Sequence, residues 1–390
     1  MVARVVGPTP ESEKDGDPGG PRGKRAAPAS RIRTMEKSDI VAVGRLFNIA
    51  FRGNDRPASE SFTRYFETLF FGSPSYSPQQ GSLVHESAGG IDSALLSIPM
   101  RFVIGDRPLT GRLLCAFMSN GRKSGVAGAA RLSRNLATST SPFFFTDNAS
   151  PVSADHWTAG GGDVLPIHSL EWRRDFRPFN ALALRAARRR PVFGHGLIRS
   201  GLSPFDILAR RSLPSYRSEQ PPGIHIVPVG LDRFYLHARP MTERFALRPA
   251  WDMDELDWLM RVAAMNTARG VLKLVEVRDG NERVVGCVLY FGKPGETALV
   301  LNVLTVAKRE QDVVAAMFAH LDAEGYSAAR GMAQPFFLNA ILRQRRLTLK
   351  YGGFFCVKSP NAEIQDAIQR NDIYLGGLAS ESWSRLLTEF

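Results

Sequence analysis

The sequence predicts an α+β fold made of two similar domains, each a mixed, mostly antiparallel sheet flanked by helices. Three observations lead to this fold class. The chain has 390 residues with 44% hydrophobic content, enough to bury the cores of two or three domains. Segments typical of strands interchange with segments of helical periodicity. The order helix, hairpin, strand, helix, strand occurs in both halves, which indicates an internal duplication.

The first half begins with a helix that Ser38 or Asp39 can cap, because both residue types accept hydrogen bonds from free helix amides. Residues rich in β-branched or aromatic side chains and bounded by turn residues predict strands at 82–86, 93–104, 109–118 and 143–146. Apolar residues recurring every three or four positions predict helices at 40–50, 62–71, 127–136 and 154–159.

The second half repeats this scheme. Asp279-Gly280-Asn281 is a hairpin turn signal between two apolar runs. The predicted strands lie at 245–248, 272–277, 284–291, 298–306 and 328–331. The predicted helices lie at 252–264 and 312–323, and Gly325 follows the second as a stop signal.

Composition divides the chain into four parts. Residues 1–30 are rich in Pro, Gly and charge and predict a disordered tail, because they cannot bury enough apolar surface to offset their ordering entropy. The first domain is expected over 31–178 and the second over 226–390. Between them, 179–225 is interrupted by Pro, Gly and Arg and predicts a basic connector.

Positive charge is concentrated around this connector. The net charge is +12, and residues 173–217 hold eleven arginines against two aspartates. Such a cluster is either a solvated linker or a contact for an anionic surface. A membrane contact is favoured over nucleic acid, because the aromatics interleaved with the cations are few. The apolar side chains available to it, beside Arg185 and Arg188–Arg190, are Phe179, Leu182, Leu184 and Ala186.

The compartment follows from what the chain lacks. The apolar runs are far shorter than the ~18 residues needed to span a bilayer, so no transmembrane segment is expected. Three widely spaced cysteines form neither a disulfide framework nor a zinc site. The histidines His168, His195 and His225 have no metal-ligand spacing. The sequence therefore predicts a cytoplasmic protein without a metal, and leaves open a peripheral attachment to a membrane.

The stretch that carries chemistry is 120–130, Asn-Gly-Arg-Lys-Ser-Gly-Val-Ala-Gly-Ala-Ala, between a predicted strand and a predicted helix. Gly125 and Gly128 let the backbone approach a ligand closely. Free amides and the dipole of the following helix favour an anion, and Arg122 and Lys123 add positive charge. The stretch matches neither a P-loop nor a dinucleotide fingerprint. It predicts a cradle for a pyrophosphate.

This stretch resembles the GNAT superfamily of acyl-CoA-dependent N-acyltransferases, whose pattern Gln/Arg-x-x-Gly-x-Gly/Ala reads here Arg122-Lys-Ser-Gly125-Val-Ala127. The resemblance, over about 38–178, implies an acyltransferase that uses acetyl-CoA or another acyl-CoA and transfers the acyl group to a small-molecule or peptide amine. Backbone amides at the end of the third predicted strand would polarise the thioester carbonyl. The implied CoA-binding residues are Phe117, Met118, Ser119, Arg122, Lys123, Ser124, Gly125, Val126, Ala127 and Gly128.

The second half lacks this loop. The corresponding stretch is 307–311, Ala-Lys-Arg-Glu-Gln, where a carboxylate would repel a pyrophosphate and bulky side chains would block it. The second domain is therefore predicted not to bind CoA. Tandem arrangements with one active half resemble the mycothiol-synthase type and, more distantly, the FemABX peptidyltransferases.

Acyl transfer to an amine requires a general base and an acid for the thiolate. Glu86 and Asp147, at the ends of predicted strands, are the candidate bases, although a structural role is an alternative for both; Asp155 and His156 are reserves. The resemblance implies a tyrosine acid four residues before Gly161, where this chain has Trp157. Two alternatives stay open: a FemABX-like aminoacyl transferase, and a non-catalytic binding or regulatory protein.

Overall fold

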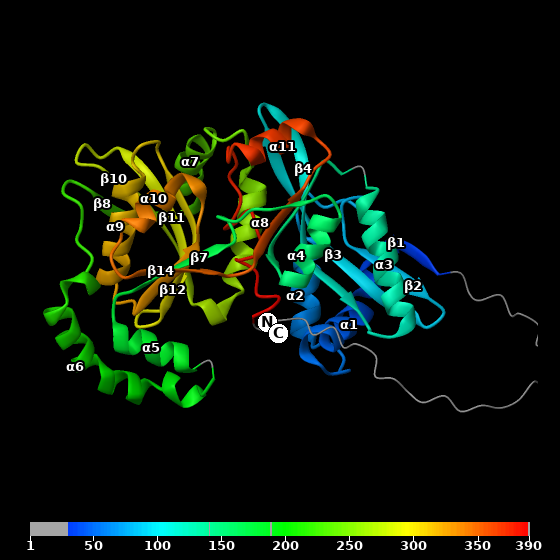
Figure 1. Ribbon diagram of the computed structural model, residues 1–390, viewed down its shortest axis with the longest axis horizontal. Helices are drawn as coiled ribbons and strands as arrows, with labels where there is room; N and C mark the ends of the chain where they lie inside the picture. Colours follow the sequence, from blue (N-terminus) through cyan, green and yellow to red (C-terminus); the bar gives the residue numbers. More distant parts are fainter. Residues whose placement is uncertain (1–29, 140, 188, 389–390) are drawn as a thin grey trace, which may run out of the picture. The chain divides into compact units, whose positions relative to one another are not determined.

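The computed structural model describes residues 30–139, 141–187 and 189–388 (Figure 1). The predicted disordered tail lies outside the described residues, apart from Ser30. The chain forms two compact units. The first comprises the described residues of Met1–Pro99 and Leu114–Thr140, and the second those of Met100–Leu113 and Ser141–Phe390.

The first sheet has the strand order β1-β2-β3-β4-β5-β15-β6, with β9 paired to β3. It runs through strands of both units because β3 and β4 each pass from one unit into the other. Its strands are β1 (Arg31–Thr34), β2 (Leu83–Ser87), β3 (Gly90–Ile104), β4 (Arg107–Ser119), β5 (Phe143–Ala149), β6 (Asp163–Val164), β9 (Leu247–Pro249) and β15 (Phe354–Lys358).

The second sheet lies in the second unit and has the order β14-β7-β13-β12-β11-β10-β8. Its strands are β7 (Leu170–Asp175), β8 (His225–Pro228), β10 (Val271–Arg278), β11 (Val284–Gly292), β12 (Thr297–Thr305), β13 (Ala328–Met332) and β14 (Leu347–Tyr351). In each sheet one pair is parallel, β4–β5 in the first and β12–β13 in the second, and a helix connects its two strands. The predicted mixed, mostly antiparallel sheets flanked by helices are therefore confirmed.

The helices include all those predicted and several more. They are α1 (Ile40–Arg52), α2 (Glu60–Phe71), α3 (Lys123–Ala137), α4 (Pro151–Ala159), α5 (Pro178–Ala187), α6 (Gly196–Ser212), α7 (Leu231–Thr242), α8 (Met253–Ala264), α9 (Glu310–Ala323), α10 (Leu338–Leu342) and α11 (Ala362–Gln369). Among the described residues, every helix is too short or too polar to cross a lipid bilayer.

The chain does not pass from one sheet to the other at the predicted domain boundary. Strand β7 precedes residue 178, yet it pairs with β13 and β14 of the second sheet. Strands β9 and β15 follow residue 226, yet they pair with β3 and β5 of the first sheet. The stretch predicted as a connector is also largely helical, because it contains α5 and α6. Local sequence patterns identify a strand but do not say which distant strand it pairs with.

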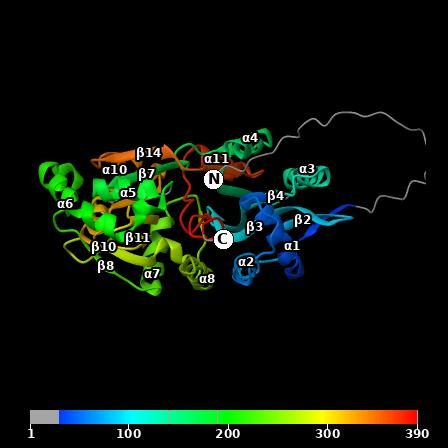
Figure 2. The same ribbon diagram turned by 90° about the horizontal axis from the view of Figure 1, so that it is seen from below.

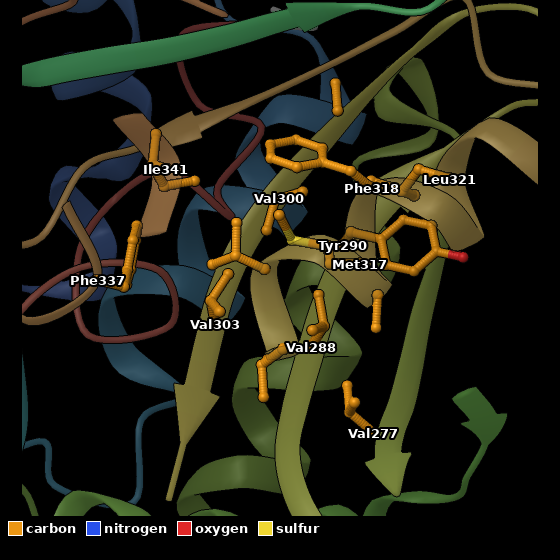
Figure 3. Packing of buried hydrophobic residues seen from close by; sticks show 14 of the residues in the cluster. Val277, Val288, Tyr290, Val300, Val303, Met317, Phe318, Leu321, Phe337 and Ile341 are labelled. Atoms are coloured by element: carbon orange, nitrogen blue, oxygen red, sulfur yellow. The ribbon is translucent and has the colours of Figure 1, made fainter. Parts of the chain in front are cut away.

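Helix α9 covers the second sheet with a continuous apolar face. Figure 3 shows Met317 and Phe318 of this helix against Val288 and Val300 of the sheet, all fully or nearly fully buried. Burying a side chain of this size stabilises the fold by about 1.5–3 kcal/mol. Gly286 of β11 allows the close approach, since a Cβ there would lie 2.5 Å from a methyl group of Val313.

In the first unit, helices cover both faces of strands β2–β4. Figure 2 shows α3 on one face and α1 with α2 on the other. Val43 and Phe47 of α1 are buried against this core. Helix α3 buries Gly125, Gly128 and Leu132, so its two glycines belong to the face that touches the sheet.

Candidate functional site

The loop between β4 and α3 is held by one asparagine. The amide of Asn120 donates to the carbonyl of Asp92 (3.0 Å), and its side-chain oxygen accepts from the amide of Arg122 (3.0 Å). Gly121 between them has φ +72°, a left-handed conformation that favours glycine. Arg122 is extended (φ −80°, ψ 164°), and α3 begins at Lys123, four residues earlier than predicted.

The start of α3 offers free amides in a positive environment. The first amides of a helix have no acceptor within it. The side chain of Arg122, the N-cap residue, makes no capping hydrogen bond, and the first turn of the helix contains no acidic residue. Arg122, Lys123 and Ser124 are exposed. Backbone donors, the helix dipole and two cationic side chains therefore meet at one exposed position, which is an arrangement that binds phosphate groups.

The glycines of the motif have a different role from the one predicted. We expected Gly125 and Gly128 to let the backbone approach a ligand, but both are buried and face β3. A Cβ on Gly125 would collide with the side-chain oxygen of Asn120, and one on Gly128 would lie 2.6 Å from Oγ of Ser93. The small residues thus let the helix approach the strand. Val126 and Ala127 are exposed.

A buried polar cluster that the sequence analysis missed lies beneath α3. Nδ1 of His85 is 2.7 Å from Oδ1 of Asp92, and the hydroxyl of Ser93 donates to the carbonyl of Gly125 (2.7 Å). Nη1 of Arg131 is 3.4 Å from Nε2 of His85, so the ring accepts there and donates through Nδ1. No motif could have revealed this cluster, because its members come from two strands and a helix.

The predicted residues at the end of β4 differ in exposure. Phe117 is exposed, Met118 is buried and Ser119 is half-buried, as alternation along a strand requires. The ladder recorded between β4 and β5 joins Gly111–Leu113 to Phe143–Phe145, and β4 continues to Ser119. These residues precede Asn120 directly, so the strand end and the helix start form one continuous segment of the first unit.

Glu86 is bound by two arginines of the first unit. Its Oε2 lies 3.0 Å from Nε of Arg33 and 2.9 Å from Nη2 of Arg31. Hydrogen bonds from Arg33 and Arg31 hold the pKa of Glu86 below its usual value. A carboxylate stabilised in this way is a weaker base. Its predicted role as general base stays a prediction, and these ion pairs count against it.

Asp147 lies in the second unit and binds the C-terminal segment. Its Oδ1 accepts from the amide of Glu381 (3.0 Å) and its Oδ2 from the hydroxyl of Ser382 (2.8 Å). Burial, with the neighbouring charge of Asp147, raises the pKa of Glu381 well above its usual value. Both oxygens of Asp147 are engaged, which favours the structural alternative for this candidate base. Trp157, at the position of the implied acid, is half-buried on α4.

The corresponding helix of the second sheet, α9, has acidic side chains in its first turn. Glu310 is the first residue of α9, and its Oε1 accepts from Nη1 of Arg244 at 2.8 Å. Asp312 in the same turn accepts from Arg309 at 2.7 Å. The first turn of α9 therefore contains two carboxylates, whereas the first turn of α3 contains no acidic residue.

Comparison with proteins of known structure identifies the fold of this chain. No protein-family model matches the chain, and no curated protein matches it. A conserved protein of Enterococcus faecalis, described as a probable N-acyltransferase, has a TM-score of 0.54 at 11% identity over 85% of this chain and 73% of its own. A GCN5-related N-acetyltransferase of Anabaena variabilis has 0.53 at 9% identity over 85% and 73%.

A third structure, a GCN5-related N-acetyltransferase of Kribbella flavida, has a TM-score of 0.50 at 11% identity, over 86% of this chain and 72% of its own. At such identities the likeness concerns the path of the chain and not its individual residues. Each match extends over most of the chain. The chain therefore has the fold of the GCN5-related N-acetyltransferases, as the sequence resemblance implied.

Proposed function

We propose that this protein is an acyl-CoA-dependent N-acyltransferase whose CoA pyrophosphate binds at the start of α3. The observation that carries the proposal is the combination of an uncapped helix start, an exposed pair of cations at Arg122 and Lys123, and a left-handed Gly121 that turns the strand into the helix. The fold supports it, because solved structures with this fold include N-acetyltransferases.

The reaction would be direct attack on the thioester. The nitrogen of a neutral amine bonds to the carbonyl carbon and gives up one proton, the carbon–sulfur bond breaks, and the CoA thiolate takes up a proton. A backbone amide near Phe117–Ser119 would stabilise the oxyanion, since preorganised donors are the largest contribution to such catalysis. Acetyl-CoA is the first acyl donor to test, and the acceptor would be an amine of a small molecule or a peptide.

The two sheets differ in whether the helix beside them could bind the CoA pyrophosphate. CoA would bind through the first sheet, because α3 presents amides and cations, whereas the carboxylates of Glu310 and Asp312 would repel a pyrophosphate at α9. The FemABX-like and non-catalytic alternatives have no specific observation in their favour.

The most specific test of the proposed pyrophosphate site removes a single backbone N–H group from the start of α3. Lys123 is the first helical residue, where proline is tolerated, and Arg122 before it already has the extended conformation that a following proline requires. Lys123→Pro therefore removes one N–H and one charge with little disturbance of α3. Lys123→Ala is the matched control, because it removes the charge alone.

Calorimetry with acetyl-CoA, longer acyl-CoAs and free CoA would measure the effect. Hydrogen bonds to charged groups contribute about 1.5–3 kcal/mol, so Lys123→Pro should bind CoA about tenfold or more weakly than Lys123→Ala. Equal affinities of the two variants would place the pyrophosphate elsewhere. If the wild type binds no CoA species at all, the proposal fails. Gly125 is unsuitable for this test, because a larger side chain there would collide with Asn120.

A further inference from the structure

The second unit contains a helical arm, α5 and α6 with their connection (178–212), and arginine side chains of α6 bind it to the rest of the unit. Arg210 of α6 donates to both oxygens of Asp322, at 2.7 and 3.2 Å, and to the carbonyl of Phe176 at 3.0 Å. Arg199, also on α6, donates to the carbonyl of Gly295. Figure 1 shows the arm at the margin of the second sheet, near β12 and β14.

The contact between the two helices of the arm is also polar at its centre. Asp206 of α6 is buried and accepts from the amides of Phe179 (2.8 Å) and Asn180 (3.2 Å), at the start of α5. The side-chain amide of Asn180 adds a third hydrogen bond (2.7 Å). Asp206 thus accepts hydrogen bonds from the first amides of α5, as a capping carboxylate does.

The outward side of the arm is apolar instead. Leu197, Phe205 and Leu208 of α6 are 80%, 56% and 62% exposed, and their spacing places them on the side of the helix opposite Arg199 and Asp206. A surface helix of a globular protein normally turns its apolar stripe toward the core. Here the stripe faces solvent and the polar side faces the protein, so α6 is an amphipathic helix turned outward.

Helix α5 extends the same apolar surface. The rings of Phe179 and Phe205 are 5.9 Å apart, and both are exposed. Leu182, one turn after Phe179, is 59% exposed. We call this surface, formed by Phe179, Leu182, Leu197, Phe205 and Leu208, the apolar face of the arm. Exposed apolar side chains that gather on one side of an element indicate a binding surface.

The positive charge of the arm favours an anionic partner. The arm holds seven arginines and one aspartate, Asp206, and both Asp206 and the preceding Asp175 are already engaged. Asp175 accepts from Arg173 (2.8 Å) and Arg185 (2.7 Å), and Asp206 is bound as above. Arg189, Arg190 and Arg211 are exposed. A second copy of this arm would be repelled by like charge, whereas an anionic partner would be attracted to it.

We infer that the apolar face of the arm docks on an anionic phospholipid membrane, inserting its leucines and phenylalanines among the acyl chains while the surrounding arginines bind lipid phosphates. Exposed aliphatic side chains bordered by arginine on a helix lying flat are typical of interfacial membrane helices. Nucleic acid fits less well, because aliphatic side chains offer no stacking platform for bases.

The structure places the candidate membrane contact on partly different residues from those that the sequence analysis proposed. Of the α5 residues proposed for it, Phe179 and Leu182 are exposed, but Leu184 and Ala186 are half-buried. Most of the apolar face comes from α6, a helix that sequence patterns did not predict. The inference concerns where the protein acts and does not depend on the proposed transferase activity.

Vesicle co-sedimentation of the full chain tests this inference. Vesicles of neutral phosphatidylcholine are compared with vesicles that contain about one third phosphatidylserine, at low and high salt. The wild type should bind the anionic vesicles at low salt and bind less at high salt, because exposed charges are screened. Leu197→Gln/Leu208→Gln should weaken the partition about tenfold or more, since it removes apolar insertion. Arg211→Ala should weaken it about fivefold.

Matched controls lie outside the arm. Leu236→Gln on α7 replaces a leucine that is 63% exposed, and Arg261→Ala on α8 replaces an arginine that is 70% exposed; neither should change binding. Failure of the wild type to bind anionic vesicles at low salt would overturn the inference, as would unchanged binding by the double leucine variant. The inference would also be overturned if tRNA or polyglutamate competed fully with the vesicles and if the leucine substitutions did not change this binding. The arm would then be a simple anion-binding surface.

Discussion

His85 donates through Nδ1 to Oδ1 of Asp92, 2.7 Å away, directly beneath the first two turns of α3. This pair has room only because residue 128 of the helix has no side chain. A Cβ there would lie 2.5 Å from Nδ1 of His85 and 2.7 Å from Oδ1 of Asp92. The helix that offers the proposed pyrophosphate site is therefore positioned by packing against a polar pair on the sheet.

Gly128→Ala should lower the free energy of unfolding by about 1–3 kcal/mol, because the buried side chains of His85, Asp92 and Ser93 would have to move away from the added methyl group. Denaturant unfolding would measure the change. Gly201→Ala on α6 is the matched control: no heavy atom lies within 4 Å of its added Cβ, so it should stabilise the helix by about 0.5–1 kcal/mol. Equal effects of both substitutions would contradict the close packing of α3.

Glu255 on α8 should make stability depend on pH. Burial raises its pKa to about 7, although the amide of Arg101 donates to its Oε1 at 3.1 Å. Between the usual value of 4.5 and about 7 the folded state holds the proton more tightly than the unfolded state. The free energy of unfolding therefore falls as pH rises through this window, and the loss persists at higher pH.

Glu255→Gln lacks this titration, so its stability relative to the wild type should rise between pH 5 and 8, by up to about 3 kcal/mol. Thermal or urea unfolding across this range would show the trend. Glu60→Gln, which replaces a glutamate whose side chain is 88% exposed, provides the comparison. A constant difference between Glu255→Gln and the wild type would mean that Glu255 is ionised throughout.

Arg210→Ala should loosen the arm. It leaves the buried carboxylate of Asp322 without its bidentate partner, although Arg177 remains 3.5 Å away and the amide of Ser218 still donates at 3.0 Å. A cost of about 1–3 kcal/mol for local opening corresponds to proteolytic cleavage within 178–212 that is about five- to a hundredfold faster. The neighbouring Arg211→Ala should leave cleavage unchanged. An unchanged cleavage rate in Arg210→Ala would show that other contacts hold the arm.

Glu86→Gln tests the predicted general base. Because Arg31 and Arg33 already bind this carboxylate and hold its pKa low, we expect the variant to keep most of the acyl-transfer rate and the pH profile of the wild type. The rate of CoA thiol release with a responsive amine would be followed from pH 6 to 9. A rate reduced a hundredfold or more at all pH values would assign the base to Glu86 despite its ion pairs.

The sequence alone determined the local elements and the family resemblance. Strands β2–β4 and β10–β13 and helices α3, α8 and α9 were predicted within a few residues, because alternation and helical periodicity are properties of neighbouring residues. The stretch 122–127 likewise indicated the fold, since its spacing is read directly along the chain.

Only the tertiary structure decided which elements meet. The pairing of β15 with β5 joins Val357 to Phe145, and that of β7 with β13 joins Trp172 to Gly331. No local pattern encodes such pairs, because strand partners are selected by the packing of the whole core. The inward direction of Gly128 and the outward direction of the apolar face of α6 have the same cause: which side of a helix is buried depends on what lies beside it.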